Sequence, residues 1–191
     1  MTSEFSRRTI LRGMAALSVL AMPLLHGSGR RLRAATLDEE ANAMSKEEFP
    51  PVDFSKEEWR ERLDPEAFDI LFREKTERAF TSPLNEEKRD GTYVCAACYL
   101  PLFLSDMKFD SGTGWPSFYT HIEGRIGTKR DFRLIIPRTE YHCIRCGGHQ
   151  GHVFSDGPEP TGQRWCNNGR ALRFVPEGEP LPALRGQRQD G

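Results

Sequence analysis

The chain has 191 residues with a formal net charge of −1, and 37% of its residues are hydrophobic while 29% are charged. This balance excludes a wholly disordered chain, and without a basic excess it gives no sign of a nucleic-acid or anionic-membrane partner. The 17 glycines and 13 prolines indicate many turns, which favours a β-rich or irregular domain over a helical bundle.

The N-terminus predicts an export signal. Residues 6–12, SRRTILR, resemble the twin-arginine motif, and a mildly apolar run follows over residues 13–25. That run is shorter than the roughly 20 apolar residues of a membrane span, and Pro23 interrupts it, so no stable membrane anchor is expected. We interpret residues 1–43 as a twin-arginine-type signal peptide whose cleavage site stays open, and we expect a periplasmic, bacterial location. An ordinary basic tail is the alternative.

Two short helices are predicted after a charged, proline-containing linker at residues 44–54. In the stretch SKEEWRER, Ser55 is a suitable N-cap and Glu58 completes a capping box. In the stretch DPEAFDILFREK, Asp64 is placed to cap the helix and Pro65 suits its first turn. An apolar stripe at helical spacing in the second helix indicates core packing, and it consists of Phe68, Leu71 and Phe72.

After TSPLNEEKRDG the pattern changes from a helical period to short strands and turns. The candidate strands, separated by clusters of Gly, Pro, Asp and Asn, are TYVC, LFL, FRLIIP, YHC, HVF, RWC and ALRFVP. This pattern predicts a mainly β domain ending near Pro176. Residues 177–191 are polar and rich in Pro and Gly, and we expect them to form a disordered tail.

Four of the five cysteines form two C-x-x-C pairs, Cys95 with Cys98 and Cys143 with Cys146. Two residues between thiolates let a tight turn aim both sulfurs at one ion, and two such turns close a tetrahedral four-thiolate zinc site. Because four thiolates leave no open coordination position, we expect one structural Zn²⁺ per chain. Two structural disulfides are the alternative, although each would close a very short loop and so constrain little of the chain.

Four stretches carry a more specific pattern. They are GTYVCAACYLPLF from Gly91, KFDSGTGWPSF from Lys108, RTEYHCIRCGGHQGHVFSDGP from Arg138 and TGQRWCNN from Thr161. In this order they closely resemble the B-type methionine sulfoxide reductases, which act on the R epimer of the sulfoxide. The resemblance spans residues 55–176. It implies two antiparallel sheets, short N-terminal helices and a structural four-cysteine zinc site away from the catalytic centre.

The resemblance also implies roles for single residues. Cys166 matches the catalytic cysteine, and His152, the second histidine of HQGH, matches the proposed acid. His149 matches the first histidine and would assist, and Asn168 matches a polar residue of the pocket. Trp115 of GWPSF matches the aromatic wall that receives the substrate methyl group. The remaining candidates for substrate contacts are Phe118, Asp156 and Arg164.

These residue types suit the chemistry. A sulfoxide sulfur accepts a nucleophile when its oxygen is protonated or hydrogen-bonded, so a thiolate must reach the sulfur and an acid must reach the oxygen. Cys166 and His152 would supply these groups, and Cys166 would end as a sulfenic acid. Each residue alone also has a plainer interpretation: a lone cysteine is usually a small buried hydrophobe, and Asn168 could cap a turn.

The chain departs from the pattern at several positions. Many relatives carry a second, resolving cysteine two residues before the tryptophan, where this chain has Thr113. We therefore expect an external thiol, from a thioredoxin-like protein or a small molecule, to reduce the sulfenic acid. Gln150 replaces the usual leucine of HQGH, and Gly169 and Arg170 replace the usual Ser-Ala. We expect all three changes at the rim of the site.

The sequence thus predicts a monomeric, exported, zinc-stabilised oxidoreductase that repairs methionine-R-sulfoxide in oxidised proteins, as part of an oxidative stress response. Two other hypotheses stay open. A non-catalytic zinc-ribbon binding module would hold zinc and an inert Cys166. A thiol–disulfide oxidoreductase would use a C-x-x-C pair for exchange and would not need Cys166.

Overall fold

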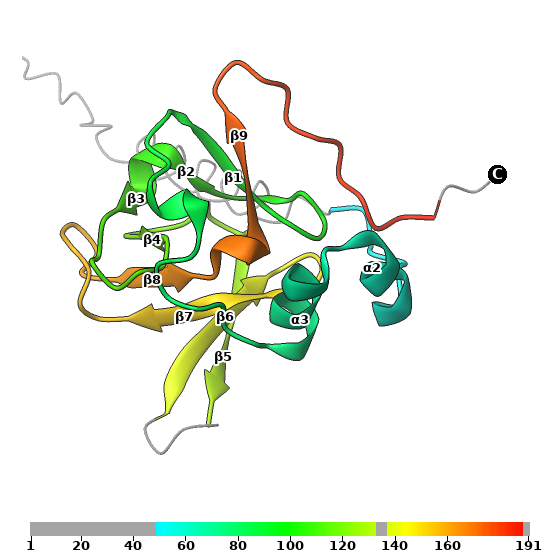
Figure 1. The fold of residues 1–191 in the computed structure, drawn as a ribbon, viewed down its shortest axis with the longest axis horizontal. Helices are drawn as coiled ribbons and strands as arrows, with labels where there is room; N and C mark the ends of the chain where they lie inside the picture. The colour runs from blue at the N-terminus through cyan, green and yellow to red at the C-terminus, as the bar shows by residue number, and fades with distance from the viewer. Residues whose placement is uncertain (1–48, 133–136, 189–191) are drawn as a thin grey trace, which may run out of the picture. The chain divides into compact units, whose positions relative to one another are not determined.

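The computed structural model describes residues 49–132 and 137–188, which form two antiparallel sheets with two helices beside them (Figure 1). One sheet has the strand order β2-β1-β9 and the other the order β3-β4-β8-β7-β6-β5. The first consists of β1 (Gly91–Cys95), β2 (Pro101–Leu104) and β9 (Leu172–Pro176). The second consists of β3 (Lys108–Phe109), β4 (Ser117–Phe118), β5 (Ile126–Asp131), β6 (Arg138–Cys143), β7 (His149–Phe154) and β8 (Arg164–Asn167). The predicted mainly β class is confirmed.

Both predicted helices are present, as α2 (Lys56–Arg62) and α3 (Pro65–Arg73). The capping box of α2 forms as expected, because the Glu58 N–H donates to Ser55 Oγ at 3.3 Å and the Ser55 N–H donates to Glu58 Oε2 at 2.7 Å. The Asp64 carboxylate caps α3 by accepting from the first-turn N–H groups. No described helix is long and apolar enough to cross a membrane.

Aromatic side chains fill the space between the two sheets. Phe103 of β2 stacks on Phe118 of β4 with ring centroids 4.1 Å apart, and Tyr93 of β1 meets the same ring edge-on at 5.1 Å. The predicted stripe of α3 joins this core, since Phe68 and Leu71 are buried. The core therefore fixes the six-stranded sheet against its smaller partner.

The region before β6 contains a strand that the sequence does not predict, β5. Residues 133–136 of the predicted strand FRLIIP lie outside the described residues, and the described ends of that stretch, Phe132 and Pro137, belong to no strand. β5 is the edge strand of its sheet and its side chains are largely exposed and polar, so it lacks the apolar alternation that marks a strand.

The expected disordered tail instead packs against the domain as far as residue 188, without helix or strand. The Arg185 guanidinium lies 4.2 Å from the centre of the Tyr99 ring and donates to the Ala96 carbonyl at 2.6 Å. The Asp53 N–H donates to the Gly186 carbonyl at 2.7 Å, so the linker packs there too. These contacts depend on distant carbonyl groups, which the composition of the tail does not reveal. The predicted signal peptide, residues 1–43, lies outside the described residues.

Three short 3-10 helices complete the described fold. The last of them lies between β8 of the six-stranded sheet and β9 of the three-stranded sheet, so it connects the two sheets. The chain therefore turns sharply just beyond the strand that carries the fifth cysteine. The three are η1 (Pro83–Asn85), η2 (Ser105–Met107) and η3 (Gly169–Ala171).

Candidate active site

Four thiols meet where the two sheets adjoin. β1 ends at Cys95 and the following turn brings in Cys98, while β6 ends at Cys143 and its turn brings in Cys146. The four Sγ atoms lie within 4.8 Å of one another, with Cys95 to Cys146 at 3.7 Å and Cys98 to Cys143 at 3.5 Å. Tetrahedral zinc with Zn–S bonds near 2.3 Å needs sulfurs about 3.8 Å apart, whereas a disulfide needs about 2 Å. All four thiols are free of disulfides, so the cluster fits a metal ion.

Gln150 links this thiol cluster to the neighbouring strand β8. Its side chain is fully buried, its Nε2 donates to Cys95 Sγ at 3.5 Å, and its Oε1 accepts from Asn167 Nδ2 at 3.4 Å. The expectation that Gln150 lies at the rim of the site is therefore wrong. Its side chain projects into the core from β7, where hydrogen bonds to Cys95 and Asn167 offset the cost of burying an amide.

Cys166 lies in β8, between β4 and β7. Its register partners are Ser117 on β4 and His152 on β7, so these side chains project from the same face of the sheet. A Cβ on Gly151 would lie 1.9 Å from the Cys166 carbonyl oxygen, so glycine is needed for β7 and β8 to approach this closely. Cys166 is half-buried.

The surroundings of Cys166 act on its thiol in opposite directions. Burial raises the pKa of Cys166, and this is the largest effect. The positive charge of Arg164 and hydrogen bonds from Thr113 and Arg164 lower that pKa, while the Asp156 charge raises it. Because the raising effects prevail, the thiol form predominates at neutral pH before substrate binds.

Two carboxylates hold the two histidines. His152 Nε2 lies 2.8 Å from Asp131 Oδ2, which also accepts from Arg138 Nη2 at 2.8 Å. Burial lowers the pKa of His152 more than the Asp131 bond raises it, so the ring is mostly neutral at pH 7. The His149 and His152 rings lie 5.4 Å apart, centre to centre. The histidine ring beside Cys166 is thus oriented by an acidic partner on β5.

His149 has a similar partner. It is buried, and its Nδ1 lies 2.8 Å from Glu140 Oε1, while Lys129 Nζ contacts Glu140 Oε2 at 2.8 Å. The sequence analysis missed both Glu140 and Asp131. Glu140 directly precedes the predicted strand YHC, and a carboxylate on a buried strand face needs a cationic or hydrogen-bonding partner, so that position carried a usable signal. Asp131 carried none.

Glu77 joins Trp115 to Asn168. The Glu77 carbonyl accepts from Trp115 Nε1 at 3.2 Å, and the Glu77 N–H donates to Asn168 Oδ1 at 3.1 Å. Asn168 Nδ2 donates to the Gln150 carbonyl at 3.0 Å, so both ends of this buried amide contact backbone. The Glu77 carboxylate accepts from the Gly169 N–H at 2.6 Å. The described contacts of Asn168 are thus those of a structural anchor beside Cys166.

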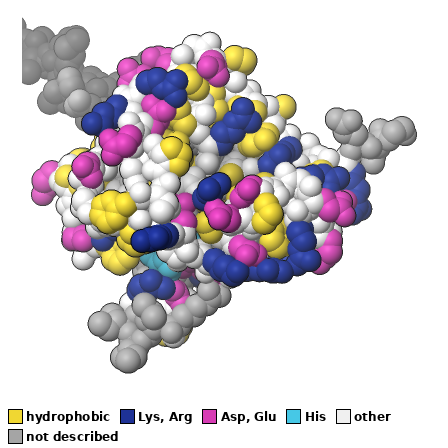
Figure 2. Space-filling view, viewed as in Figure 1, with side chains coloured by type: hydrophobic (Ala, Val, Ile, Leu, Met, Phe, Trp, Pro, Cys, Tyr) yellow, Lys and Arg dark blue, Asp and Glu magenta, His cyan; other side chains and the backbone are white. Residues whose placement is uncertain are grey.

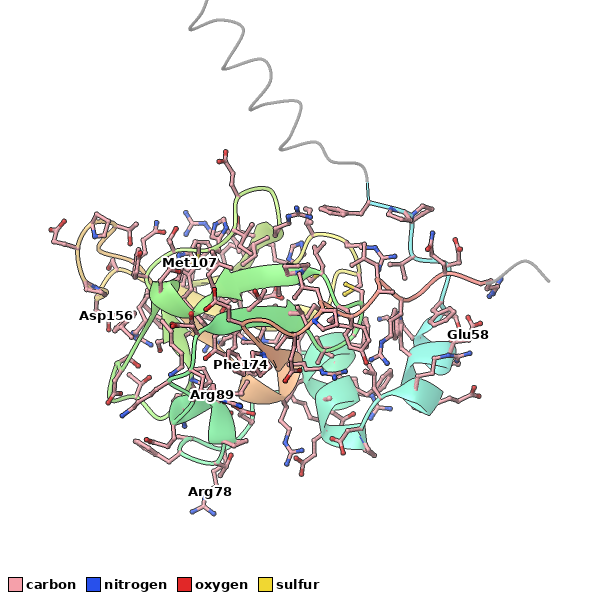
Figure 3. The ribbon with its side chains drawn as sticks, turned by 90° about the horizontal axis from the view of Figure 1, so that it is seen from above. Glu58, Arg78, Arg89, Met107, Asp156 and Phe174 are labelled. Carbon is pink, nitrogen blue, oxygen red and sulfur yellow. The ribbon has the colours of Figure 1, made fainter. Side chains whose placement is uncertain are left out.

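The remaining candidates are placed differently from one another. Phe118 is fully buried between core aromatic rings, so it has no surface with which to contact a substrate, and its predicted role is corrected to core packing. Arg164 forms a bidentate pair with Asp156, at 2.8 and 3.0 Å, and its charge acts on Cys166. Figure 3 shows Asp156 on the β7–β8 loop, at the side of the domain opposite Glu58 of α2.

Charges of both signs cover the face of the domain drawn in Figure 2. Lys and Arg side chains are interspersed with Asp and Glu, and a small area of histidine surface is visible among them. This mixture agrees with the formal net charge of −1. The positive charge that acts on Cys166 is that of Arg164.

Comparisons with known proteins agree with this geometry. A family model described as the SelR domain matches residues 63–176. The peptide methionine sulfoxide reductase MsrB of Agrobacterium fabrum is 50% identical over 128 residues, which cover 66% of this chain and 95% of that protein. The MsrB of Pseudomonas putida is 52% identical over 126 residues, covering 65% and 95%. Peptide methionine sulfoxide reductase B1, chloroplastic, of Arabidopsis thaliana is 49% identical over 130 residues, covering 68% and 63%.

Proposed function

The chain belongs to the B-type methionine sulfoxide reductases, which are peptide-methionine (R)-S-oxide reductases, and from this premise we propose that Cys166 is the nucleophile and His152 the acid. The register of β7 and β8 carries this proposal, because it puts the two side chains opposite each other on one face. Both strands lie inside the six-stranded sheet, which holds the two groups in a fixed relation.

The proposed step conserves protons. Cys166 Sγ attacks the sulfoxide sulfur, and the thiol proton passes by way of the neutral His152 ring to the sulfoxide oxygen. The new Sγ–sulfur bond and the sulfur–oxygen bond of the substrate then break as an Sγ–oxygen bond forms, so methionine leaves and the oxygen is transferred to Cys166 as a sulfenic acid. The thiol is oxidised by two electrons and the sulfoxide is reduced by two. A largely neutral His152 suits this relay better than a permanently protonated one, since it can accept the thiol proton first.

Trp115 and Asn168 would support the reaction through their shared contact with Glu77. The half-buried indole of Trp115 offers an apolar wall for the substrate methyl group, and its Nε1 bond to the Glu77 carbonyl fixes the ring. Asn168 binds the backbone N–H of the same residue, Glu77, so the Trp115 ring is held at a fixed distance from the end of β8, the strand that carries Cys166. We assign Arg164 to stabilising the thiolate and His149 to orienting His152.

We propose Zn²⁺ as the ion of the thiol cluster, held by Cys95, Cys98, Cys143 and Cys146. Bound there with a filled tetrahedral shell, it would supply a crosslink and no Lewis acid, because no coordination position stays open. The crosslink would join the end of β1 to the end of β6, and thus one sheet to the other.

We propose an external thiol as reductant of the sulfenic acid. The chain has five cysteines, and four of them form the cluster, so an internal resolving thiol would have to come from the metal site. Thr113 stands where a resolving cysteine would lie and offers no thiol. A thioredoxin-like protein or a small thiol would attack the Cys166 sulfenic acid, release water and then resolve the mixed disulfide.

The N-terminal motif supports a location for the activity. Export by the twin-arginine route would place the monomeric enzyme in the periplasm, where it would repair oxidised exported proteins. Fractionation of cells with and without an Arg7→Lys, Arg8→Lys double change tests this proposal. Loss of the protein from the periplasmic fraction in the double variant is expected, and an unchanged distribution would contradict it.

The enzymatic function is tested on the separated R and S sulfoxides of a blocked methionine with dithiothreitol. The wild-type chain should reduce the R epimer alone, and Cys166→Ser should abolish turnover while retaining the metal. A Cys166→Ser variant with wild-type turnover would refute the proposed nucleophile. Turnover that disappears only when a C-x-x-C pair is changed, with no stoichiometric metal, would favour a thiol–disulfide oxidoreductase instead.

A further inference from the structure

A C-terminal segment, residues 181–186, lies against the turn that carries two of the four cluster thiols, and we call it the strap. Figure 1 shows this red segment meeting the cyan linker beside α2. The Asp53 N–H of the linker donates to the Gly186 carbonyl at 2.7 Å, and Leu184 packs against the hydrophobic core. The family model matches residues 63–176, so the strap lies beyond the matched domain.

Arg185 of the strap binds the backbone of the first C-x-x-C turn. Its Nη2 donates to the Ala96 carbonyl at 2.6 Å, its Nε donates to the Ala97 carbonyl, and its backbone N–H donates to the Cys98 carbonyl at 3.2 Å. The guanidinium also lies 4.2 Å from the centre of the Tyr99 ring, directly after the turn. One strap residue therefore provides donors for three consecutive carbonyl groups of a turn that carries cluster thiols.

Arg145 connects the second C-x-x-C turn to the same place. Its Nη1 donates to the Arg185 carbonyl at 2.6 Å and to the Cys98 carbonyl at 3.5 Å. Its Nε donates to the Pro50 carbonyl at 3.0 Å, so the linker takes part as well. The two thiol-bearing turns are thus joined through the strap, in addition to any ion that the thiols hold.

These contacts oppose the motion by which such a site loses its ion. A filled four-thiolate shell offers no position to an incoming ligand, so release needs one C-x-x-C turn to move away by local opening. Opening of the first turn would break its three bonds to Arg185. Two of those bonds come from a charged guanidinium, and charge-assisted bonds are stronger than neutral ones.

We propose that the strap retains the metal, because Arg185 slows the opening of the first C-x-x-C turn and so slows both the release of the ion and the exposure of the thiols. Arg185 is a positioning residue in this role, since it acts through the backbone of the turn. The inference rests on the proposed Zn²⁺ site and is independent of the reaction at Cys166.

The test measures the rate at which excess coloured chelator removes Zn²⁺ from the full metal-loaded chain. Arg185→Ala should release the metal about tenfold faster than wild type or more, since outer contacts of metal ligands typically change metal affinity by at least that factor. Arg185→Lys should lie between the two, because an ammonium keeps the charge but lacks the planar fork that spans two carbonyls. Arg188→Ala removes an exposed ion pair with Glu58 beyond the strap, so it is the matched control and should match wild type.

Low concentrations of urea separate local opening from a loss of overall stability. Opening of one turn exposes little surface, so release by this route should be nearly independent of urea well below the unfolding transition. Release through global unfolding accelerates with urea. Equal rates in Arg185→Ala and wild type, or an Arg185→Ala rate that rises with urea in step with unfolding, would overturn the inference.

The thiols give a second readout that needs no metal. After chelation of both chains, iodoacetamide should label the cluster cysteines faster in Arg185→Ala than in wild type, as quantified by peptide mapping. A wild-type chain purified without stoichiometric metal would refute the proposed Zn²⁺ site. Faster labelling of Arg185→Ala would then still support a strap that holds the turn closed, and equal labelling would overturn it.

Discussion

His152 and Cys166 lie opposite each other on adjacent antiparallel strands, as register partners in the β7–β8 pair. The two strands belong to the interior of the six-stranded sheet, so the spacing of the two side chains does not depend on a loop. Gly151 lets the strands approach, and Asp131 on β5 orients the His152 ring. The groups proposed to react are therefore placed by sheet register, and the surrounding residues shift their pKa values.

Asp131→Asn should weaken the proton relay, because it makes His152 a poorer acceptor of the Cys166 proton. The Asp131 carboxylate raises the pKa of His152, against burial that lowers it. Without that charge the pKa of His152 falls further, so its titration moves to lower pH and turnover should drop by about 10²-fold. The pH dependence of kcat on the R sulfoxide checks this. Asp69→Asn, on α3 and paired with Lys75, is the control, and an unchanged profile in Asp131→Asn would contradict the role.

Glu77→Gln should loosen the anchor between the N-terminal segment and η3. The Glu77 carboxylate accepts from the Gly169 N–H at 2.6 Å and from the Arg170 N–H at 3.0 Å. A neutral amide replaces two charge-assisted bonds, so the free energy of unfolding should fall by about 2 kcal/mol. Denaturant unfolding measures this, with the exposed Glu123→Gln as control. Equal midpoints for the two variants would show that the anchor does not contribute.

Gln150→Leu should weaken the thiol cluster while leaving the fold intact. Leucine has a similar volume, but it cannot donate to Cys95 as the Gln150 amide does. Outer hydrogen bonds to metal ligands typically affect metal affinity by about tenfold or more, so a chelator should remove the metal about tenfold faster from the variant. The exposed Gln187→Leu serves as control. Identical release rates would show that the Gln150 bond is dispensable.

Cys98→Ser should separate the structural site from the reactive one. Replacing one thiol of the cluster would open the proposed metal shell and remove the proposed crosslink between the two sheets. The variant should lose stoichiometric zinc and unfold at a temperature lower by about 10 °C or more. Metal analysis and thermal unfolding check both effects. Cys166→Ser should retain the metal and the melting temperature, and equal zinc content in Cys98→Ser would contradict the assignment.

Local chemistry explains what the sequence predicted well. Ser55 with Glu58 and Asp64 with Pro65 mark their helices because capping involves neighbouring residues only. The C-x-x-C pairs also indicate a possible metal site from the sequence alone, since their spacing directs two sulfurs toward one ion. The facing of Cys166 and His152 came from a resemblance to a family, because no local pattern reports strand register.

Other features depend on contacts between distant segments. The Glu77 carboxylate binds the backbone N–H of Gly169, about ninety residues further along the chain. The Gln150 side chain can be buried because the Cys95 thiol and the Asn167 amide are its hydrogen-bond partners. The motif GWPSF indicates a pocket position for Phe118, but its ring stacks on Phe103 in the core. β5 was missed because an exposed edge strand needs no apolar alternation.

The central claim, that Cys166 takes the oxygen of the substrate, is tested by a single turnover without reductant. One equivalent of a methionine-R-sulfoxide peptide is reacted with the metal-loaded chain, sulfenic acid is trapped with dimedone, and peptides are mapped by mass spectrometry. We expect one adduct on Cys166 for each methionine formed, with the thiols of the cysteine cluster unmodified. Methionine formation accompanied by a disulfide between Cys166 and a cluster cysteine, or by an adduct elsewhere, would contradict it.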